Sequence, residues 1–307
     1  MNQFQANLCL LCVTLCWSTE VIIFACIPVS VSPFAVTCVT SLVGGALLLL
    51  AFFRRVRAAL ADNWKRLLRH GLDLGVLNCA YNVLYQFGLK DFDVSTGAFT
   101  LCITVTLLPF VMLFQRRRVE KKTWLSAFFV MAGIICASVG AVTRAEVPGL
   151  LVITAGCVLR AVFILKLNRY ARENDPVVLS VAMSVIIGSI GFGMWFVTQP
   201  ATFSAIPWSP SVIACLAVYS YFIISFAQTL NVFAQRRAKA TDATIIYALE
   251  IVFSVIWGII LPPSLIDPVK PTPHLLLGLL FVLLGNLVEL VDLKRLFKRQ
   301  SVGEGSA

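Results

Sequence analysis

Ten apolar runs of about 20 residues each divide this chain, and they constrain its fold more than any other feature. A helix of about 20 residues, rising about 1.5 Å per residue, spans the roughly 30 Å hydrocarbon core of a bilayer. Strands of a membrane barrel would be about 10 residues long and would alternate in polarity. The sequence therefore predicts an all-α membrane protein with ten transmembrane helices, at residues 6–27, 32–53, 70–90, 94–115, 124–143, 149–168, 177–197, 210–233, 240–261 and 274–293.

The composition agrees with a chain whose main partner is the lipid bilayer. Hydrophobic residues make up 59% of the 307 residues and charged residues only 13%, whereas a soluble domain is about one quarter charged. The net charge of +10 does not indicate nucleic acid, because the basic residues fall in short clusters between the apolar runs. All ten cysteines lie inside apolar runs, which is typical of small buried residues and not of a disulfide framework.

The basic residues predict the orientation of the chain in the membrane. Of the 25 Lys and Arg residues, 21 follow the second, fourth, sixth, eighth and tenth apolar runs. The opposite side carries only Lys90, Arg144 and Lys270. By the positive-inside rule both termini are cytoplasmic, and we expect a multi-pass protein of a bacterial cytoplasmic (inner) membrane.

The chain also repeats itself with a shift of 143 residues. Four identities accompany the parallel layout of apolar runs, in which Pro33, Ser41, Gly45 and Phe53 fall on Pro176, Ser184, Gly188 and Phe196. Each half holds an odd number of spans, so the second half must insert upside down. We therefore expect two inverted five-helix repeats, 1–143 and 149–293, followed by a cytoplasmic tail, 294–307. Inverted repeats of this kind build alternating-access transporters.

Three charged residues lie deep inside predicted spans: Glu20, Arg160 and Glu250. A charge at that depth is costly and is a functional hypothesis by default. Arg160 stays protonated at ordinary pH and needs a counter-charge, so one interpretation is a structural ion pair with either glutamate. The remaining carboxylate would then carry a proton or hold a cationic group of a substrate.

Two predicted spans also carry polar stripes. Amides that face lipid would lack hydrogen-bond partners, so we expect both stripes to point into the protein. The third span places Asn78, Asn82 and Gln86 on one helix face beside Tyr81 and Tyr85, and the eighth span repeats the pattern with Tyr221, Ser225 and Gln228. These stripes either bond helices to one another or line a substrate cavity.

The sequence lacks the motifs of an ATP-driven pump or a membrane hydrolase. It has no phosphate-binding loop and no nucleophile–base motif, so we expect no enzyme activity and no cofactor. Cys9, Cys12 and Cys16 share a helix face with Glu20, which would suit a soft-metal path. No histidine joins this group, and we expect no metal site.

Several stretches resemble the drug/metabolite transporter (DMT) superfamily, EamA type. Leu15-Cys16-Trp17-Ser18 is similar to the opening signature of the family, and Ser32-Pro33 and Asp175-Pro176 are similar to the starts of its second spans. Further similarity is found in Gly88-Leu89-Lys90, Ser95-Thr96-Gly97-Ala98-Phe99, Leu108-Pro109-Phe110, Ala240-Thr241-Asp242-Ala243 and Leu249-Glu250. Two positions depart from the pattern: Ile251 stands where the family often has Pro, and Arg160 where it often has Trp.

The resemblance implies a transporter of small metabolites, amino acids prominently, with a substrate cavity between spans 1, 3, 4, 6, 8 and 9. Together with the residues above, it favours a secondary carrier for a small polar metabolite, most simply an amino acid or related zwitterion. Arg160 would hold the carboxylate of the substrate, and Glu20 or Glu250 an ammonium group or a coupling proton. Two alternatives are efflux of organic cations and a non-transporting membrane scaffold or subunit.

The predicted partners are thus the bilayer and a small-molecule substrate, with a homodimer left open. The predicted substrate-binding residues are Trp17, Glu20, Asn78, Tyr81, Asn82, Tyr85, Arg160, Tyr221, Ser225, Gln228 and Glu250.

Overall fold

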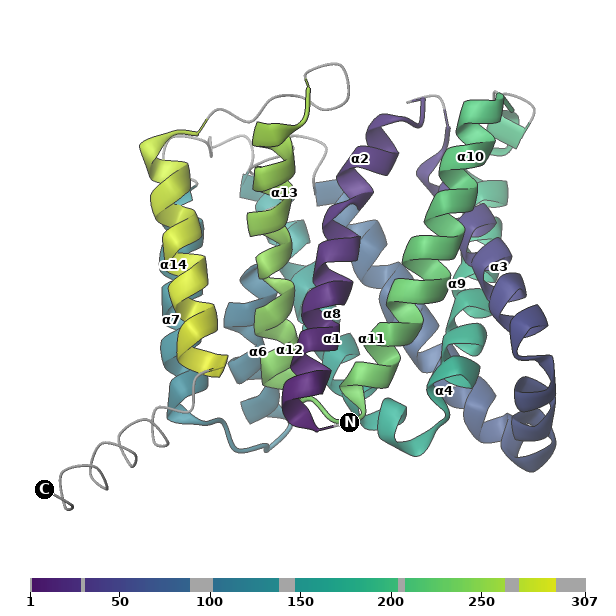
Figure 1. Cartoon of the computed structure of the whole chain (residues 1–307), viewed down its shortest axis with the longest axis horizontal. Helices are drawn as coiled ribbons and strands as arrows, with labels where there is room; N and C mark the ends of the chain where they lie inside the picture. Colours follow the sequence, from purple (N-terminus) through teal and green to yellow (C-terminus); the bar gives the residue numbers. More distant parts are fainter. Residues whose placement is uncertain are drawn as a thin grey trace, which may run out of the picture.

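A computed structural model describes residues 2–28, 31–88, 102–137, 147–203, 208–262 and 271–290. Across these ranges the chain is helical and contains no strand, as expected for an all-α protein (Figure 1). Its elements are α1 (Gln3–Ser18), α2 (Glu20–Ala25), α3 (Pro33–Ala51), α4 (Phe53–Gly88), α6 (Ile103–Phe114), α7 (Lys121–Ala137), α8 (Val147–Glu173), α9 (Pro176–Thr198), η3 (Pro200–Phe203), α10 (Pro210–Val218), η4 (Tyr219–Ala227), α11 (Gln228–Gln235), α12 (Ala240–Tyr247), α13 (Leu249–Ile260) and α14 (Pro273–Leu290).

Five helical stretches are long and apolar enough to cross a membrane: Pro33–Ala51, Val147–Glu173, Pro176–Thr198, Pro210–Gln235 and Ala240–Ile260. Shorter apolar helices add to them at Ile103–Phe114 and Pro273–Glu289. A multi-pass membrane protein follows from these stretches, whereas the count of ten spans in two inverted halves stays a prediction. Lys90, Arg144, Lys270, the Ser95–Phe99 motif and the tail 294–307 lie outside the described residues.

Two helices begin at the serine–proline and aspartate–proline pairs noted in the sequence. The Ser32 hydroxyl accepts a hydrogen bond from the Phe34 amide at the start of α3, at 3.2 Å. The Asp175 carboxylate accepts one from Val177 at the start of α9, at 3.0 Å. In both cases the proline occupies the first helical position, where its missing N–H costs nothing.

The basic segment after α3 is helical, which corrects the expectation of a loop before a span at 70–90. Helix α4 covers 36 residues from Phe53 and consists of two helical stretches that meet at a kink at Asn63. Arg, Lys, Leu and Ala are strong helix formers, so this segment keeps its helix outside the apolar run. The part before Asn63 lies at the end of the bundle where the chain starts (Figure 1).

The helices pack in pairs that join residues far apart in the sequence. Helix α3 lies along α9, α4 along α8 and α9, and α7 along α14. Helix α1 packs between α11 and the α12–α13 stretch (Figure 1). The largest apolar core cluster draws residues from both predicted halves, so the halves interlock and do not form separate lobes.

Glycine allows two of these pairs to approach closely. A methyl group built on Gly44 of α3 would stand 2.7 Å from the Ile224 Cγ2 atom of η4. One built on Gly133 of α7 would stand 2.7 Å from the carbonyl oxygen of Gly278 in α14. Small residues at such crossings let helix backbones pack where lipid provides no hydrophobic driving force.

We expect Gly133→Ala to destabilise the protein by about 1–3 kcal/mol, because the new methyl group would force α7 away from α14. Gly193→Ala in α9 is the matched control, since no atom lies within 4 Å of its added Cβ. Alanine favours a helix over glycine by about 1 kcal/mol, so the control should melt at the same temperature or higher. Thermal unfolding in detergent measures both variants, and equal melting curves would contradict the proposed close contact.

Candidate functional site

The first span is interrupted beside its half-buried carboxylate, Glu20. Helix α1 ends at Ser18 and α2 begins at Glu20. The Ser18 hydroxyl donates to the Leu15 carbonyl at 2.7 Å, and the Thr19 hydroxyl donates to the Cys16 carbonyl at 2.7 Å. Hydroxyl groups that bond preceding carbonyls compete with the helical ladder and bend it. The sequence Ser18-Thr19 therefore sets the break that puts Glu20 at the first position of α2.

A second interruption places the other carboxylate. Helices α12 and α13 meet at Ala248, and Glu250 lies in the first turn of α13. Trp257 of α13 donates its indole N–H to the buried Ser18 hydroxyl at 2.9 Å, which holds the two broken stretches together. Broken helices at membrane depth are the usual building blocks of transporter substrate sites.

The three deep charges converge on one region of the structure. The Nη2 atom of Arg160 lies 3.7 Å from Oε2 of Glu250. Glu20 interacts electrostatically with both Arg160 and Glu250. Helices α2, α8 and α13 contribute one charge each, so Glu20 faces other helices and not lipid. The Arg160 and Glu250 side chains keep 13% and 22% of their surface exposed.

Aromatic side chains surround these charges. The hydroxyl of Tyr219, at the first position of η4, donates a hydrogen bond to the Glu20 carboxylate. Trp17 packs against Tyr247 with ring centroids 5.2 Å apart. Tyr81 of α4 lies within electrostatic range of Arg160, Glu20 and Glu250. Hydroxyl donors and aromatic faces therefore line the same region as the charges.

The polar stripe of the third span bonds mainly within its own helix. The Asn78 amide donates to the Tyr81 hydroxyl at 3.0 Å, and the Asn82 amide donates to the backbone and side-chain oxygens of Asn78 at 2.9 and 3.1 Å. All three are half-buried. Tyr85, one turn further, interacts electrostatically with Arg160. This face of α4 therefore points toward the charged cluster, whereas the side chain of Gln86 lies outside the described residues.

Within the stripe expected in the eighth span, the Tyr221 side chain is 63% exposed, and its role in binding stays a prediction. The segment Tyr219–Ala227 is a π-helix, whose wider turn does not keep residues seven apart, such as Tyr221 and Gln228, on one face. Ser225 is buried and donates to the Gly44 and Ser220 carbonyls at 3.0 and 2.9 Å, so it bonds α3 to η4.

Gln228 lies just beyond the π-helix, at the start of α11. Its Nε2 atom is buried without a hydrogen-bond partner among the described residues. Its role in binding stays a prediction.

Tyr219 and Tyr247 were not among the residues predicted from the sequence. Tyr219 opens a π-helix, whereas apolar periodicity assumes an α-helix. Tyr247 is buried, and it accepts a hydrogen bond from Gln235 at 2.9 Å and bonds Asn231. Its position next to Trp17 depends on the packing of α1 against α12, which spacing along the chain does not reveal.

No group of His, Cys, Asp and Glu able to hold a metal ion is found in the described part of the chain. The ten cysteines are free thiols, and Cys12 is exposed while Cys9 and Cys16 are half-buried.

Comparisons with known proteins extend these observations. Residues 5–139 match the model of the EamA-like transporter family, and this region falls inside the first predicted repeat. No curated protein matches the chain. A solved crystal structure is 20% identical in sequence, with a TM-score of 0.74, and the match covers 95% of this chain and 98% of that one. At this identity the likeness shows a shared fold.

Proposed function

We propose that this chain is a membrane transporter of the EamA-like family, whose model matches residues 5–139, and that it is a secondary carrier of a small zwitterion such as an amino acid. The carrier would work in a bacterial inner membrane by alternating access, without enzymatic chemistry. The observation behind this proposal is the meeting of Glu20, Arg160 and Glu250 at two broken helices.

The helix pairing supports the inverted repeat that alternating access needs. A shift of 143 residues relates α1–α2 to α8, α3 to α9, α4 to α10–α11, α6 to α12–α13, and α7 to α14. Under this relation the α3–α9 and α7–α14 pairs map onto themselves. The α4–α8 pair maps onto the α1–α11 pair, and the α4–α9 pair maps onto the α3–η4 pair. The α6–α8 pair maps onto the contact of α1 with α12 and α13. The contact pattern thus has the two-fold character that related halves would give.

Glu20 is the residue best suited to bind the ammonium group of the substrate. None of the described basic side chains comes within ion-pair distance of it, and Tyr219 donates the hydrogen bond given above. An ammonium group would supply the missing counter-charge, and the nearby Trp17 and Tyr81 rings would favour a cation further. Alternatively a proton would neutralise Glu20 in the empty carrier, which would couple transport to protons.

Arg160 would hold the carboxylate of the substrate. Its contact with Glu250 is long, at 3.7 Å, so the guanidinium keeps donors that a carboxylate could use. Arginine binds carboxylates through two parallel N–H donors, which also fixes their orientation. The substrate would bridge Glu20 and Arg160, and the two charges of a zwitterion would each meet an opposite charge.

Efflux of organic cations is the second candidate, because Arg160 is already paired with Glu250. The cluster then has one uncompensated carboxylate, Glu20, among aromatic rings, which suits a quaternary amine. A scaffold without transport is the candidate from another class. A ligand at 100 times its Kd stabilises the folded protein by about 2.7 kcal/mol. The scaffold would therefore be favoured if no solute of a broad panel raised the melting temperature of the purified protein.

We expect Glu20→Gln to weaken substrate binding and flux about tenfold or more, since a hydrogen bond to a charged group contributes about 1.5–3 kcal/mol. Asp62→Asn is the control, because Asp62 is an exposed carboxylate on α4, remote in the sequence from the cluster. Flux in proteoliposomes and thermal shift with the same solute measure both variants. Wild-type flux in the Glu20 variant would remove this residue from the site.

A double variant, Arg160→Gln with Glu250→Gln, separates the two substrate classes. Removing the pair together avoids the penalty of about 3–5 kcal/mol for leaving one buried charge alone. For a zwitterion carrier we expect amino-acid flux to fall at least tenfold while the protein stays folded. The opposite result has two parts: the wild type transports amines but no amino acids, and the double variant keeps the amine flux. This result would favour the organic-cation carrier and contradict the carboxylate role of Arg160.

A further inference from the structure

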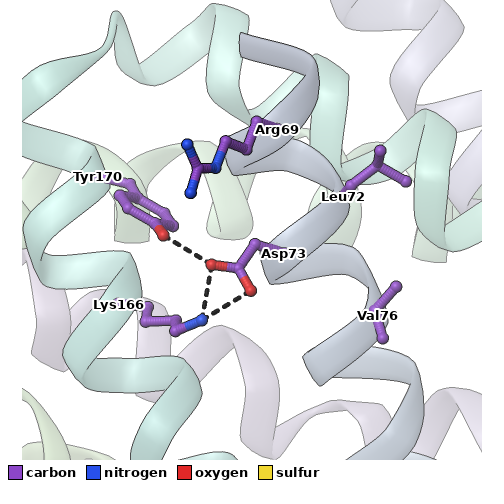
Figure 2. A pocket seen from close by; sticks show the side chains of 6 residues that line it. All are labelled: Arg69, Leu72, Asp73, Val76, Lys166 and Tyr170. Carbon is purple, nitrogen blue, oxygen red and sulfur yellow. Dashed lines mark hydrogen bonds and ion pairs between the residues drawn. The ribbon is translucent and has the colours of Figure 1, made fainter. Parts of the chain in front are cut away.

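An open groove lies between α4 and α8, outside the charged cluster described above (Figure 2). Its volume is about 490 Å³, enough for a polar headgroup. The lining residues are Arg69, Leu72, Asp73, Val76, Lys166 and Tyr170. The groove lies toward the end of the bundle that carries the basic segment of α4, where the positive-inside rule places the cytoplasmic leaflet.

The acidic group in this groove is already satisfied. Lys166 donates to both carboxylate oxygens of Asp73 at 2.7 Å, and the Tyr170 hydroxyl donates to Asp73 at 2.6 Å. The Lys166 side chain is still 37% exposed, and an ammonium group has three N–H donors. One donor of Lys166 is therefore free to bind an anion that enters the groove.

Arg69 gives the groove a surplus positive charge. It lies one helical turn before Asp73, is exposed, and forms no ion pair with the acidic residues of the described ranges. Its side chain points to the same side of α4 as Asp73, toward α8 (Figure 2). A guanidinium group presents a planar fork of donors that matches phosphate oxygens. Arg69 and Lys166 together form a place for one phosphate group.

The other side of the groove is apolar and exposed. Leu72 and Val76 are one turn apart on α4, and they are 44% and 52% exposed. Both point away from Asp73, to the outer side of the helix (Figure 2). In a helix that enters the bilayer, such side chains contact acyl chains. Free phosphate would use only the basic side of the groove, whereas a phospholipid would use both.

We propose that the groove between α4 and α8 binds an anionic phospholipid of the leaflet nearest to it, with its phosphate on Arg69 and Lys166 and an acyl chain along Leu72 and Val76. Basic pockets between transmembrane helices at the cytoplasmic side are suited to anionic headgroups. Because α4 and α8 belong to different predicted halves, the lipid would also stabilise the contact between the halves. The proposal is independent of the transported substrate.

The test adds lipid to the purified full-length protein in detergent. We expect phosphatidylglycerol to raise the melting temperature and to remain bound in native mass spectrometry, and phosphatidylcholine to do so more weakly, because the groove has a net positive charge. Inorganic phosphate is the arm for a free anion, and we expect it to have little effect at the same concentration. Equal stabilisation by inorganic phosphate and by phosphatidylglycerol would overturn the assignment to a lipid.

Two variants locate the effect. Arg69→Gln should weaken phosphatidylglycerol binding about tenfold, because it removes a charge-assisted contact to phosphate. Arg57→Gln removes an exposed arginine of α4 that lies before the Asn63 kink and outside the groove, and it should leave the binding unchanged. Because both side chains are exposed, both variants should fold, and size-exclusion chromatography checks this. Equal losses in the two variants, or no loss in either, would show that the groove is not the lipid site.

Discussion

The cost of placing charges inside a membrane governs this structure. Glu20, Arg160 and Glu250 lie in apolar helices, where an unpaired charge costs several kcal/mol. The three charged side chains come from α2, α8 and α13 and lie in one region, where the Tyr219 hydroxyl donates a hydrogen bond to Glu20. Arg160 compensates one carboxylate and leaves the other with aromatic and hydroxyl neighbours. This imbalance is the physical basis of our proposal that the site accepts a positively charged group.

The convergence depends on two helix breaks and on close helix packing. The Ser18 and Thr19 hydroxyls end α1, and Ala248 separates α12 from α13, so both carboxylates lie at the starts of helical segments. Trp257 bonds the two broken stretches to each other through Ser18. Glycines at the α3–η4 and α7–α14 crossings let the neighbouring helices approach within contact distance. The charged cluster is therefore a property of the whole bundle and not of one motif.

Much of this arrangement could be predicted from the sequence, because membrane depth makes a few residues very informative. The apolar runs indicated helices, the Ser32-Pro33 and Asp175-Pro176 pairs marked helix starts, and the cost of burying Arg160 indicated a counter-charge from one of the two glutamates. Periodicity failed where the backbone departs from an α-helix. Within the π-helix, Tyr219 donates a hydrogen bond to Glu20, whereas the Tyr221 side chain is exposed. Charge content likewise suggested a loop before residue 70, although helix-forming side chains make that segment part of α4.

The most direct test of the account is a structure of the carrier with its transported solute bound. We expect the solute to lie between Glu20 and Arg160, with a cationic group near the Glu20 carboxylate and the Tyr219 hydroxyl. For a zwitterion, its carboxylate should contact the Arg160 guanidinium. A transported solute that contacts neither Glu20 nor Arg160 would contradict the central claim that the buried charges form the substrate site.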